Sequence, residues 1–406
     1  MTTFDDLYAA ARDLPIIDWH NHLDMRMLAE DKPLGSLYEV WVKADPYKHR
    51  AMRICGEPER LITGTTGVSP VEQVPESEKW AAWMRTLPKL IGNPLFAWAK
   101  MEMEFLGLDA NAYLRGEGEN VMLSEWTPSK LLAKFKVEYL SPCMTASSLG
   151  QRASCPLEKA PVRVVPSLRM NAGEVVAQEA LERFHAAGCR VVDISVDDAA
   201  QLETCYDSLA AVAAFAAAHR WTMLLHLGAL RETSARLRAA AGPVGGFAGM
   251  RAPVDPAAVA AFLNRLECNG QDARCPSGLP RTILLTLNPE AHAQLAVLAG
   301  SFVEDGVPGK VQLGPAWWWC DHAEAIRDVF EKQAAYGVLS TFVGMTTDSR
   351  SLLSFVRHDY FRRLFCRWLA DKVAAGDIPD DPALLLPIVE KVCCRTACDM
   401  VKGIFT

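Results

Sequence analysis

The sequence predicts an α/β fold of the (β/α)8-barrel (TIM-barrel) type, and two patterns lead to this prediction. Short β-branched runs alternate with longer helical patterns over most of the 406 residues, which is typical of βαβ units and a parallel sheet. These runs number eight, which is the number of strands that closes a barrel. The expected strands are Ile16–Leu23, Val137–Pro142, Val162–Leu168, Arg190–Val196, Met223–Leu227, Thr282–Leu287, Lys310–Leu313 and Thr341–Met345.

A helical pattern follows each expected strand. The clearest helices are expected at Glu174–Ala187, Ala199–His219, Pro256–Leu266, Pro289–Gly300 and Ala323–Tyr336. Asp255 and Asn288 each stand directly before a proline, which gives a capping residue followed by proline at the first helical position. Strand and helix therefore alternate as a barrel of this type requires.

Two regions add to a plain barrel. Residues 25–125 separate the first two expected strands and show mainly helical patterns, so we interpret them as an insertion that covers the barrel mouth. Residues 1–24 and 126–406 then form the barrel itself. Near the C-terminal end, Ser351–Phe405 predicts two extra long helices that are separated at Gly376–Pro379.

The composition limits the class of partner. Half of the residues are apolar and the formal charge is −7, as expected of a globular protein with a large core. Without a clustered basic run, neither nucleic acid nor an anionic membrane is an expected partner. The most apolar stretch, Leu209–Ala218, is too short to cross a bilayer. The twelve cysteines are scattered without a CxxC pair and no signal peptide precedes them, so we expect reduced thiols and a cytoplasmic location.

Two histidines at the end of the first expected strand form the strongest local motif. In Asp18–Leu23, His20 and His22 are two residues apart, and side chains with this spacing share one face of a strand. Two neutral imidazoles at the C-terminal end of a barrel strand can hold a divalent metal. The alternative is that both are polar residues on an exposed edge strand, although the apolar Ile16 and Ile17 favour a buried one.

The last expected strand ends in polar residues that include Asp348. Barrel closure brings the first and eighth strands together, so Asp348 would face His20 and His22 and complete a set of two histidines and one carboxylate. The alternative is that Asp348 caps the helix that follows, which is a common role for aspartate.

At several separated blocks the sequence resembles the uronate isomerase (glucuronate isomerase) family, a branch of the amidohydrolase-type barrels. The blocks are Asp18–Leu23, Tyr47–Lys48, Leu225–Arg231, Thr282–Pro289, Trp317–Trp318, Val343–Arg350 and Arg357–Arg363. They follow the family order from end to end. The resemblance thus implies an amidohydrolase-like barrel and an enzyme of carbohydrate metabolism.

The resemblance also implies roles for individual residues. His20, His22 and Asp348 match the ligands of one divalent metal ion, which is usually zinc. Arg169 and Arg350 match arginines that hold a sugar acid, and a guanidinium fork suits a carboxylate. The further residues expected to contact substrate are His226, His49, Trp317 and Trp318. Ion pairs for the arginines and a structural role for His226 remain alternatives.

The implied reaction is the aldose–ketose isomerisation of an open-chain hexuronate such as glucuronate or galacturonate. A proton leaves C2 and returns at C1 through an enediol, which needs a base and a donor for the developing oxyanion. Asp348 is the expected base, Tyr47 the expected donor or proton shuttle, and Arg350 is expected to assist. Tyr47 could instead be a core aromatic. The expected partner is a small sugar acid, and a homo-oligomer is compatible with the composition.

The chain departs from the family motifs at several strand ends. Pro46 stands where the family has a histidine, and His49 follows three residues later. Ser141–Thr145 and Gly246–Gly249 lack acidic residues of the family, and Asp193–Ser195 replaces an Asp-His-Gly sequence. These losses indicate a divergent member and keep two alternatives open. One is a hydrolase or lactonase whose metal-bound water attacks, and the other is a non-catalytic sugar-acid-binding homologue.

Overall fold

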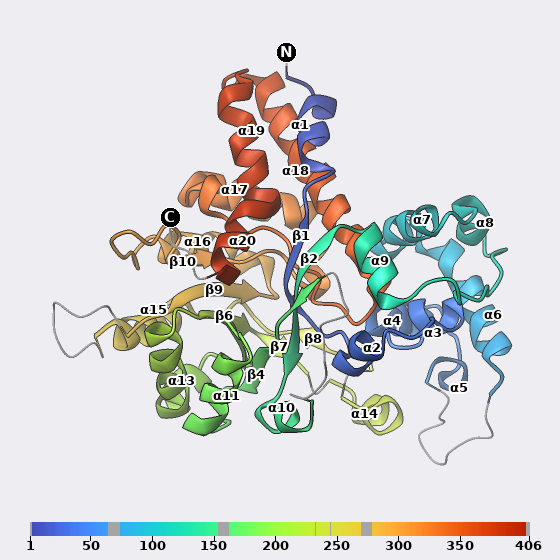
Figure 1. The fold of residues 1–406 in the computed structure, drawn as a ribbon, viewed down its shortest axis with the longest axis horizontal. Coiled ribbons are helices and arrows are strands. Elements are labelled where there is room, and N and C mark those ends of the chain that lie inside the picture. The colour runs from blue at the N-terminus through green and yellow to red at the C-terminus, as the bar shows by residue number, and fades with distance from the viewer. Residues whose placement is uncertain are drawn as a thin grey trace.

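The computed structural model describes residues 2–63, 74–152, 162–231, 233–243, 245–268 and 278–402. Its centre is a curved parallel sheet in the order β1-β2-β4-β5-β6-β9-β10, with the short strand β3 beside β2 (Figure 1). The strands are β1 Ile16–Asn21, β2 Val137–Met144, β3 Arg163–Val164, β4 Ser167–Asn171, β5 Val191–Val196, β6 Thr222–Leu227, β9 Arg281–Thr286 and β10 Val311–Leu313. β1, β5, β6 and β9 are buried at every position, as expected of parallel strands covered on both faces.

The prediction of a regular eighth strand at Thr341–Met345 is wrong, although this part of the chain still closes the barrel. Residues 339–341 form the 3-10 helix η5, and an extended segment, residues 342–348, runs from there between β10 and β1. Gly344 and Asp348 have positive φ angles of 72° and 46°, which break the pleat of a regular strand. Side chains replace the missing ladder bonds, as when Val343 N donates to Gln312 Oε1 on β10 at 2.9 Å.

On the other side of the closing segment, Asp18 of β1 binds Thr346 and Thr347 of that segment. Its carboxylate accepts hydrogen bonds from Thr346 Oγ1 at 2.5 Å and from Thr347 N at 2.8 Å. Backbone bonds continue the contact, since Asp348 N donates to His20 O at 3.1 Å and His22 N to Ser349 O at 2.8 Å. The chain is therefore a (β/α)8 barrel in which an irregular extended segment takes the place of the eighth strand.

Proline explains the second difference from the predicted strands. The expected strand Val162–Leu168 is two strands, because Pro166 has no N–H to donate to a ladder. β3 pairs with β2 before Pro166, and β4 starts after it and extends to Asn171.

The predicted helices are confirmed on the outside of the sheet (Figure 1). α17 Ala323–Tyr336 has its predicted bounds, and the long helix expected after β5 is broken at Cys205. The others are α10 Ala146–Arg152, α11 Gln178–Ala186, α12 Gln201–Thr204, α13 Tyr206–Ala218, α14 Ala235–Ala241, α15 Pro256–Cys268, η3 Pro289–Ala291 and α16 His292–Ala299. A small hairpin of β7 Ala229–Leu230 and β8 Gly249–Met250 follows β6.

The region between β1 and β2 is mainly helical and lies to one side of the sheet (Figure 1). It contains α2 Met25–Glu30, α3 Leu37–Trp41, α4 Pro46–Ile54, α5 Glu59–Ile62, α6 Glu76–Thr86, η1 Leu87–Leu90, α7 Pro94–Leu106 and α8 Ala110–Leu114, and α9 Pro128–Lys134 leads into β2. The aromatic rings of Trp41, Trp80, Trp83 and Tyr113 pack together in its core. The division into a barrel and an inserted cover, residues 25–125, stays an interpretation, and residues 64–73 lie outside the described part.

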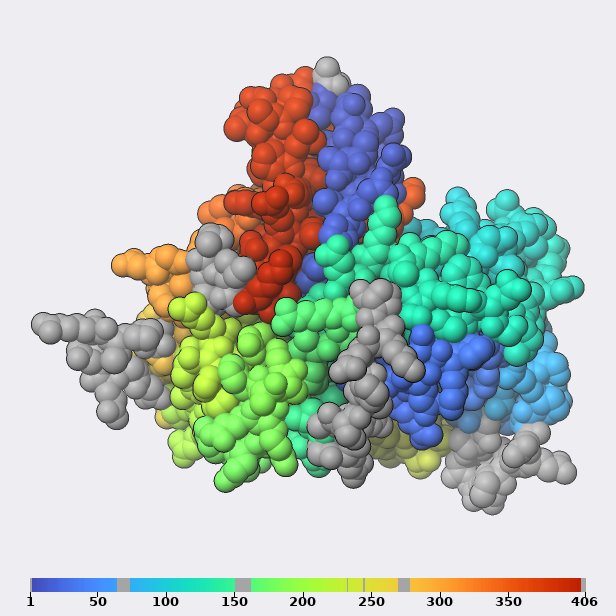
Figure 2. Space-filling view, in the orientation of Figure 1, coloured from blue at the N-terminus to red at the C-terminus, as the bar shows by residue number. Residues whose placement is uncertain are grey.

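The two long C-terminal helices are confirmed. They are α18 Val356–Ala375, then α19 Pro382–Glu390 with a π-helical turn, η7 Lys391–Arg395, and α20 Thr396–Lys402. The N-terminal helix α1 Phe4–Ala11 packs against α18 and α19, and these helices build the projection coloured blue and red in Figure 2. In the described ranges, every helix is too short or too polar to span a membrane.

Candidate active site

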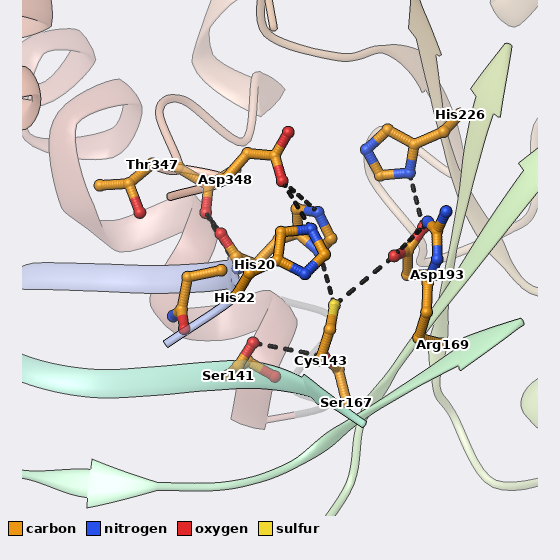
Figure 3. A network of polar contacts seen from close by, with 12 residues as sticks. His20, His22, Ser141, Cys143, Ser167, Arg169, Asp193, His226, Thr347 and Asp348 are labelled. Carbon is orange, nitrogen blue, oxygen red and sulfur yellow. Dashed lines mark hydrogen bonds and ion pairs between the residues drawn. The ribbon is translucent and has the colours of Figure 1, made fainter. Parts of the chain in front are cut away.

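His20 near the end of β1, His22 just beyond this strand and the aspartate of the closing segment meet at Asp348 Oδ1 (Figure 3). Asp348 Oδ1 lies 3.1 Å from His20 Nε2 and 3.0 Å from His22 Nε2. Only 2% of the His20 side chain and 5% of the Asp348 side chain are exposed. Asp348 does not cap the following 3-10 helix, η6 Leu352–Phe355, because Ser351 Oγ accepts from Leu353 N there. The convergence that the sequence predicts is therefore present.

This group of side chains fits a divalent metal. Ligand atoms about 2.1 Å from one metal, at angles between octahedral and tetrahedral, lie roughly 3.0–3.4 Å apart, which matches the two distances from Asp348 Oδ1 to the histidines. In the part of the chain that the structure describes, the groups whose ligand atoms all lie within 4.8 Å of one another are His20, His22 and Cys143, and His20, Asp193 and His226, so a metal at Asp348 requires the two imidazoles to move closer together. Among the described residues, the second carboxylate oxygen, Asp348 Oδ2, is buried without a hydrogen-bond partner. Burial raises the pKa of Asp348, but hydrogen bonds with His20 and His22 outweigh it and hold that pKa well below its usual range. The carboxylate is therefore ionised, as a metal ligand must be.

A second buried group lies beside the first and joins three neighbouring strands. Arg169 on β4 is opposite Asp193 on β5, and its Nη1 contacts both carboxylate oxygens of Asp193 at 2.6 and 2.5 Å. His226 Nδ1 on β6 lies 2.7 Å from Asp193 Oδ1. Burial raises the pKa of Asp193, but Arg169 and His226 lower it by more than burial raises it, so the carboxylate stays charged. Because Arg169 already balances this charge, Asp193 is a poor ligand for a second cation.

Both groups line one cavity of about 350 Å³. The lining includes the predicted residues His20, His22, Tyr47, Arg169, His226, Trp317, Trp318, Asp348 and Arg350. The Trp317 ring packs edge-on against the His226 ring with centroids 4.3 Å apart. The structure thus gathers nearly all of the predicted site residues around a space of the size that small-molecule ligands occupy.

His49 is the predicted residue that does not line this cavity. It lies on α4 with its side chain buried, and its Nε2 has no hydrogen-bond partner among the described residues. Tyr47, two residues earlier, does line the cavity, and within the described part its buried hydroxyl is also without a partner. Burial raises the pKa of Tyr47, so the hydroxyl keeps its proton and is available as a donor.

Several cavity residues were not among the predicted site residues. Among them are Asp45, Cys143, Arg231 and Trp319, and Asp193 contacts Arg169 of the cavity wall. Asp193 could have been noticed as a charged residue within the apolar run Val191–Val196. Its partner Arg169 depends on the register of β4 against β5, which no local pattern reveals. Cys143 gave no signal beyond the absence of an acidic residue at that strand end.

Comparison with known proteins identifies the family. The family model described as glucuronate isomerase matches residues 2–202 and 174–400. The chain belongs to the glucuronate isomerase family. A uronate isomerase of Geobacillus thermodenitrificans is 33% identical to it, over 94% of this chain and 93% of that protein. A uronate isomerase of Bacillus subtilis is 31% identical, over 94% and 92% of the two chains.

Solved structures of the glucuronate isomerase family share the fold. A uronate isomerase from Thermotoga maritima superposes with a TM-score of 0.82 at 23% identity, covering 98% of both chains. A glucuronate isomerase from Caulobacter crescentus gives a TM-score of 0.80 at 21% identity, covering 98% of this chain and 94% of that one. The resemblance predicted from the motif blocks is confirmed, and so is the barrel.

Proposed function

We propose that the chain is an aldose–ketose isomerase of hexuronates that uses a divalent metal held by His20, His22 and Asp348. Family membership over nearly the whole chain supports the reaction, and the shared contact of both histidines with Asp348 supports the metal position. The same comparisons do not favour a hydrolase or a non-catalytic homologue, because these curated relatives are uronate isomerases.

The metal site follows from the chemistry of its donors. Two imidazole nitrogens and one carboxylate oxygen are a common ligand set for zinc with open positions, so we propose zinc as the resident metal. A divalent metal bound there supplies a Lewis acid for an oxygen atom of the sugar. His20 and His22 present Nε2 toward Asp348 Oδ1, so these three side chains would hold the metal.

The substrate carboxylate is bound by arginine. Arg169 uses Nη1 for Asp193, so the rest of its guanidinium can meet a carboxylate in the cavity. Arg350 lines the same cavity and is exposed, so it supplies a second cation. Trp317 and Trp318 form an apolar wall for the carbon chain, and His226 supplies a hydrogen bond to a hydroxyl group.

Proton transfer is assigned to Asp348 and Tyr47. The free Oδ2 of Asp348 takes the proton from C2, and the electrons of that C–H bond form the double bond of the enediol. The acid formed at Asp348 exchanges its proton with water and delivers a proton to C1, while a hydroxyl proton passes from O2 to O1, so that aldose becomes ketose without net loss of atoms. Tyr47 donates a hydrogen bond to the oxygen that gains negative charge.

A direct assay tests the proposal. Metal-loaded protein is incubated with glucuronate and galacturonate in deuterated water, and ketose formation and deuterium in the product are followed by NMR. Ketose carrying solvent deuterium is the expected result. Uptake of solvent oxygen-18 into a carboxyl product would instead identify a hydrolase, and the absence of any turnover of hexuronates would overturn the proposal.

We further propose a cytoplasmic location. The described cysteines are all free thiols, which suits a reducing compartment. Assembly into a homo-oligomer stays a prediction that light scattering on the purified protein would test.

A further inference from the structure

The sulfur of Cys143 lies between a proposed metal ligand and a buried carboxylate (Figure 3). Cys143 is near the C-terminal end of β2, and its side chain lines the cavity. Its Sγ is 3.3 Å from His20 Nδ1 and 3.5 Å from Asp193 Oδ2. The thiol therefore joins the metal group to the Arg169–Asp193–His226 group.

A count of protons gives this contact a direction. His20 Nε2 faces Asp348 and can bind a metal only through a lone pair, so in the metal-bound protein the proton of a neutral His20 ring is on Nδ1. In the described part of the chain, the hydrogen-bond contact of His20 Nδ1 is Cys143 Sγ. The sulfur then accepts from His20, and the single thiol proton points to Asp193 Oδ2.

Ser167 adds one more contact to the sulfur without changing this order. Its Oγ lies 3.4 Å from Cys143 Sγ and 3.2 Å from Ser141 O, and a hydroxyl has one proton to donate to either. In both cases Ser167 acts as a donor. The direction from His20 through Cys143 to Asp193 is therefore retained.

We propose that Cys143 is a positioning residue for His20, fixing the tautomer and ring orientation that leave Nε2 free for the metal. This inference rests on the proposed metal site. A ligating histidine usually donates its second N–H to a carboxylate or a carbonyl oxygen, and the loss of such a partner costs metal affinity. Here a thiol occupies that place and passes the hydrogen bond on to the carboxylate of Asp193.

Direct ligation by the sulfur is the competing reading. His20, His22 and Cys143 offer ligand atoms within 4.8 Å of one another. However, the two nitrogens of an imidazole point away from each other, so a cation between Cys143 and His20 Nδ1 would not be the one that His20 Nε2 shares with Asp348. The neighbouring Asp193 carboxylate also suits a protonated thiol, which can donate to it.

Metal affinity measures the positioning role without relying on turnover. Zinc binding to the wild type, Cys143→Ala and Cys143→Ser is measured by competition with a chromophoric chelator. Cys143→Ala leaves His20 Nδ1 without its acceptor, and we expect affinity to fall about 10–100-fold. Cys143→Ser keeps an acceptor and a donor, so its affinity stays within about threefold of the wild type. Cys366→Ala, a buried thiol of α18 outside the cavity lining, is the control expected to bind zinc as the wild type does.

The absorption spectrum of the cobalt-substituted protein separates positioning from ligation. We expect no thiolate-to-cobalt charge-transfer band in the wild type and a change in the visible d–d bands in Cys143→Ala. A charge-transfer band that Cys143→Ala loses would overturn the positioning role, as would wild-type zinc affinity in a folded Cys143→Ala. When Cys143→Ala binds zinc like the wild type, Asp348→Asn separates the two proposals. Normal zinc affinity in Asp348→Asn overturns the proposed metal site itself, whereas weakened affinity in Asp348→Asn overturns only the role of Cys143.

Discussion

Asp348 adopts a backbone conformation that costs free energy. Its φ of 46° lies in the left-handed region, where a residue other than glycine costs of order 1–3 kcal/mol and is held by its surroundings. The hydrogen bond from Asp348 N to His20 O is part of that restraint. The conformation turns one carboxylate oxygen toward both histidines and leaves the other in the cavity wall. Such strain is commonly found at functional sites.

Asp348→Asn is predicted to abolish metal binding and isomerisation. Asparagine tolerates a positive φ, so the backbone is kept, but the amide lacks the charge that a divalent cation requires. We expect zinc affinity to fall more than about 100-fold, beyond the loss typical of a residue that only orients a ligand. Chelator competition and ketose formation measure the two effects.

The control for this substitution is Asp198→Asn, which removes an exposed carboxylate paired with Arg251 at 3.2 Å. A surface pair of this kind contributes little. The control is expected to retain zinc affinity and activity. Wild-type zinc affinity in Asp348→Asn would contradict its role as a ligand.

The sequence alone predicts the residues to which we assign the reaction but not the residues that surround them. His20, His22 and Asp348 follow from strand spacing and barrel closure, and Arg169 and Tyr47 from motif blocks. Cys143 and Asp193 contact these residues across strands, and those contacts depend on register. Their role could not be predicted from residue type alone, because a buried cysteine is more often a small apolar residue.

The closing segment, residues 342–348, depends on Asp18 for its attachment to β1. A regular strand would be held by a ladder of backbone bonds, whereas here backbone bonds are formed at Asp348 and Ser349, and before them a buried carboxylate accepts from Thr346 Oγ1, Thr347 N and Thr347 Oγ1. Burial raises the pKa of Asp18, but His358 and these hydrogen bonds lower it, so the carboxylate is charged. A sequence pattern cannot reveal a strand whose partners are side chains, which explains why its regular form was predicted wrongly.

Asp18→Asn is predicted to loosen barrel closure. One carboxylate oxygen becomes an amide N–H that faces other donors, so at least one buried donor loses its acceptor at a cost of about 1–3 kcal/mol. The free energy of unfolding in urea should fall by about this amount, and zinc affinity should fall with it because Asp348 is on the same segment. Thr347→Ser keeps the hydroxyl and serves as the control, with a loss below about 1 kcal/mol. Equal zinc affinity in wild type and Asp18→Asn would show that closure does not depend on this carboxylate.

Glu102 gives the helical region a pH-dependent contribution to stability. It is buried on α7 and accepts a hydrogen bond from Trp41 Nε1 on α3, and burial raises its pKa above the ordinary value. For an acid with a raised pKa in the folded state, the unfolded state releases its proton first. Stability therefore falls as pH rises from the ordinary glutamate pKa, about 4.3, up to the folded value.

Glu102→Gln is predicted to remove this dependence. Glutamine keeps an acceptor for Trp41 and does not titrate. The melting temperature of the wild type relative to Glu102→Gln should be highest below the ordinary glutamate pKa, about 4.3, and should decrease as pH rises from there through the raised pKa of the folded state. Glu104→Gln, an exposed position on the same helix paired with Lys100 at 3.6 Å, is the control. A difference between wild type and Glu102→Gln that does not change with pH would refute the raised pKa.

The metal site joins parts of the molecule that are far apart in the chain. His20 and Asp348 are 328 residues apart, and the cavity is completed by Tyr47 from the helical region between β1 and β2. The whole-chain match to the glucuronate isomerase family makes this arrangement predictable, since the motif blocks follow family order. The irregular path of the closing segment could not be predicted, because it depends on the positive φ angles of Gly344 and Asp348, which hydrophobic patterns do not encode.

A metal ion that bridges β1 and the closing segment should stabilise the whole barrel. Binding to the folded state alone adds RT ln(1 + [L]/Kd), which is about 2.7 kcal/mol at a free zinc concentration of 100 times Kd. Treatment with a chelator is therefore predicted to lower the melting temperature of the wild type, and added zinc to restore it. Asp348→Asn should melt at the same temperature with chelator or with zinc, because it cannot complete the bridge. An equal rise in the melting temperature of both proteins on adding zinc would place the stabilising ion elsewhere and show that no metal ion bridges β1 and the closing segment.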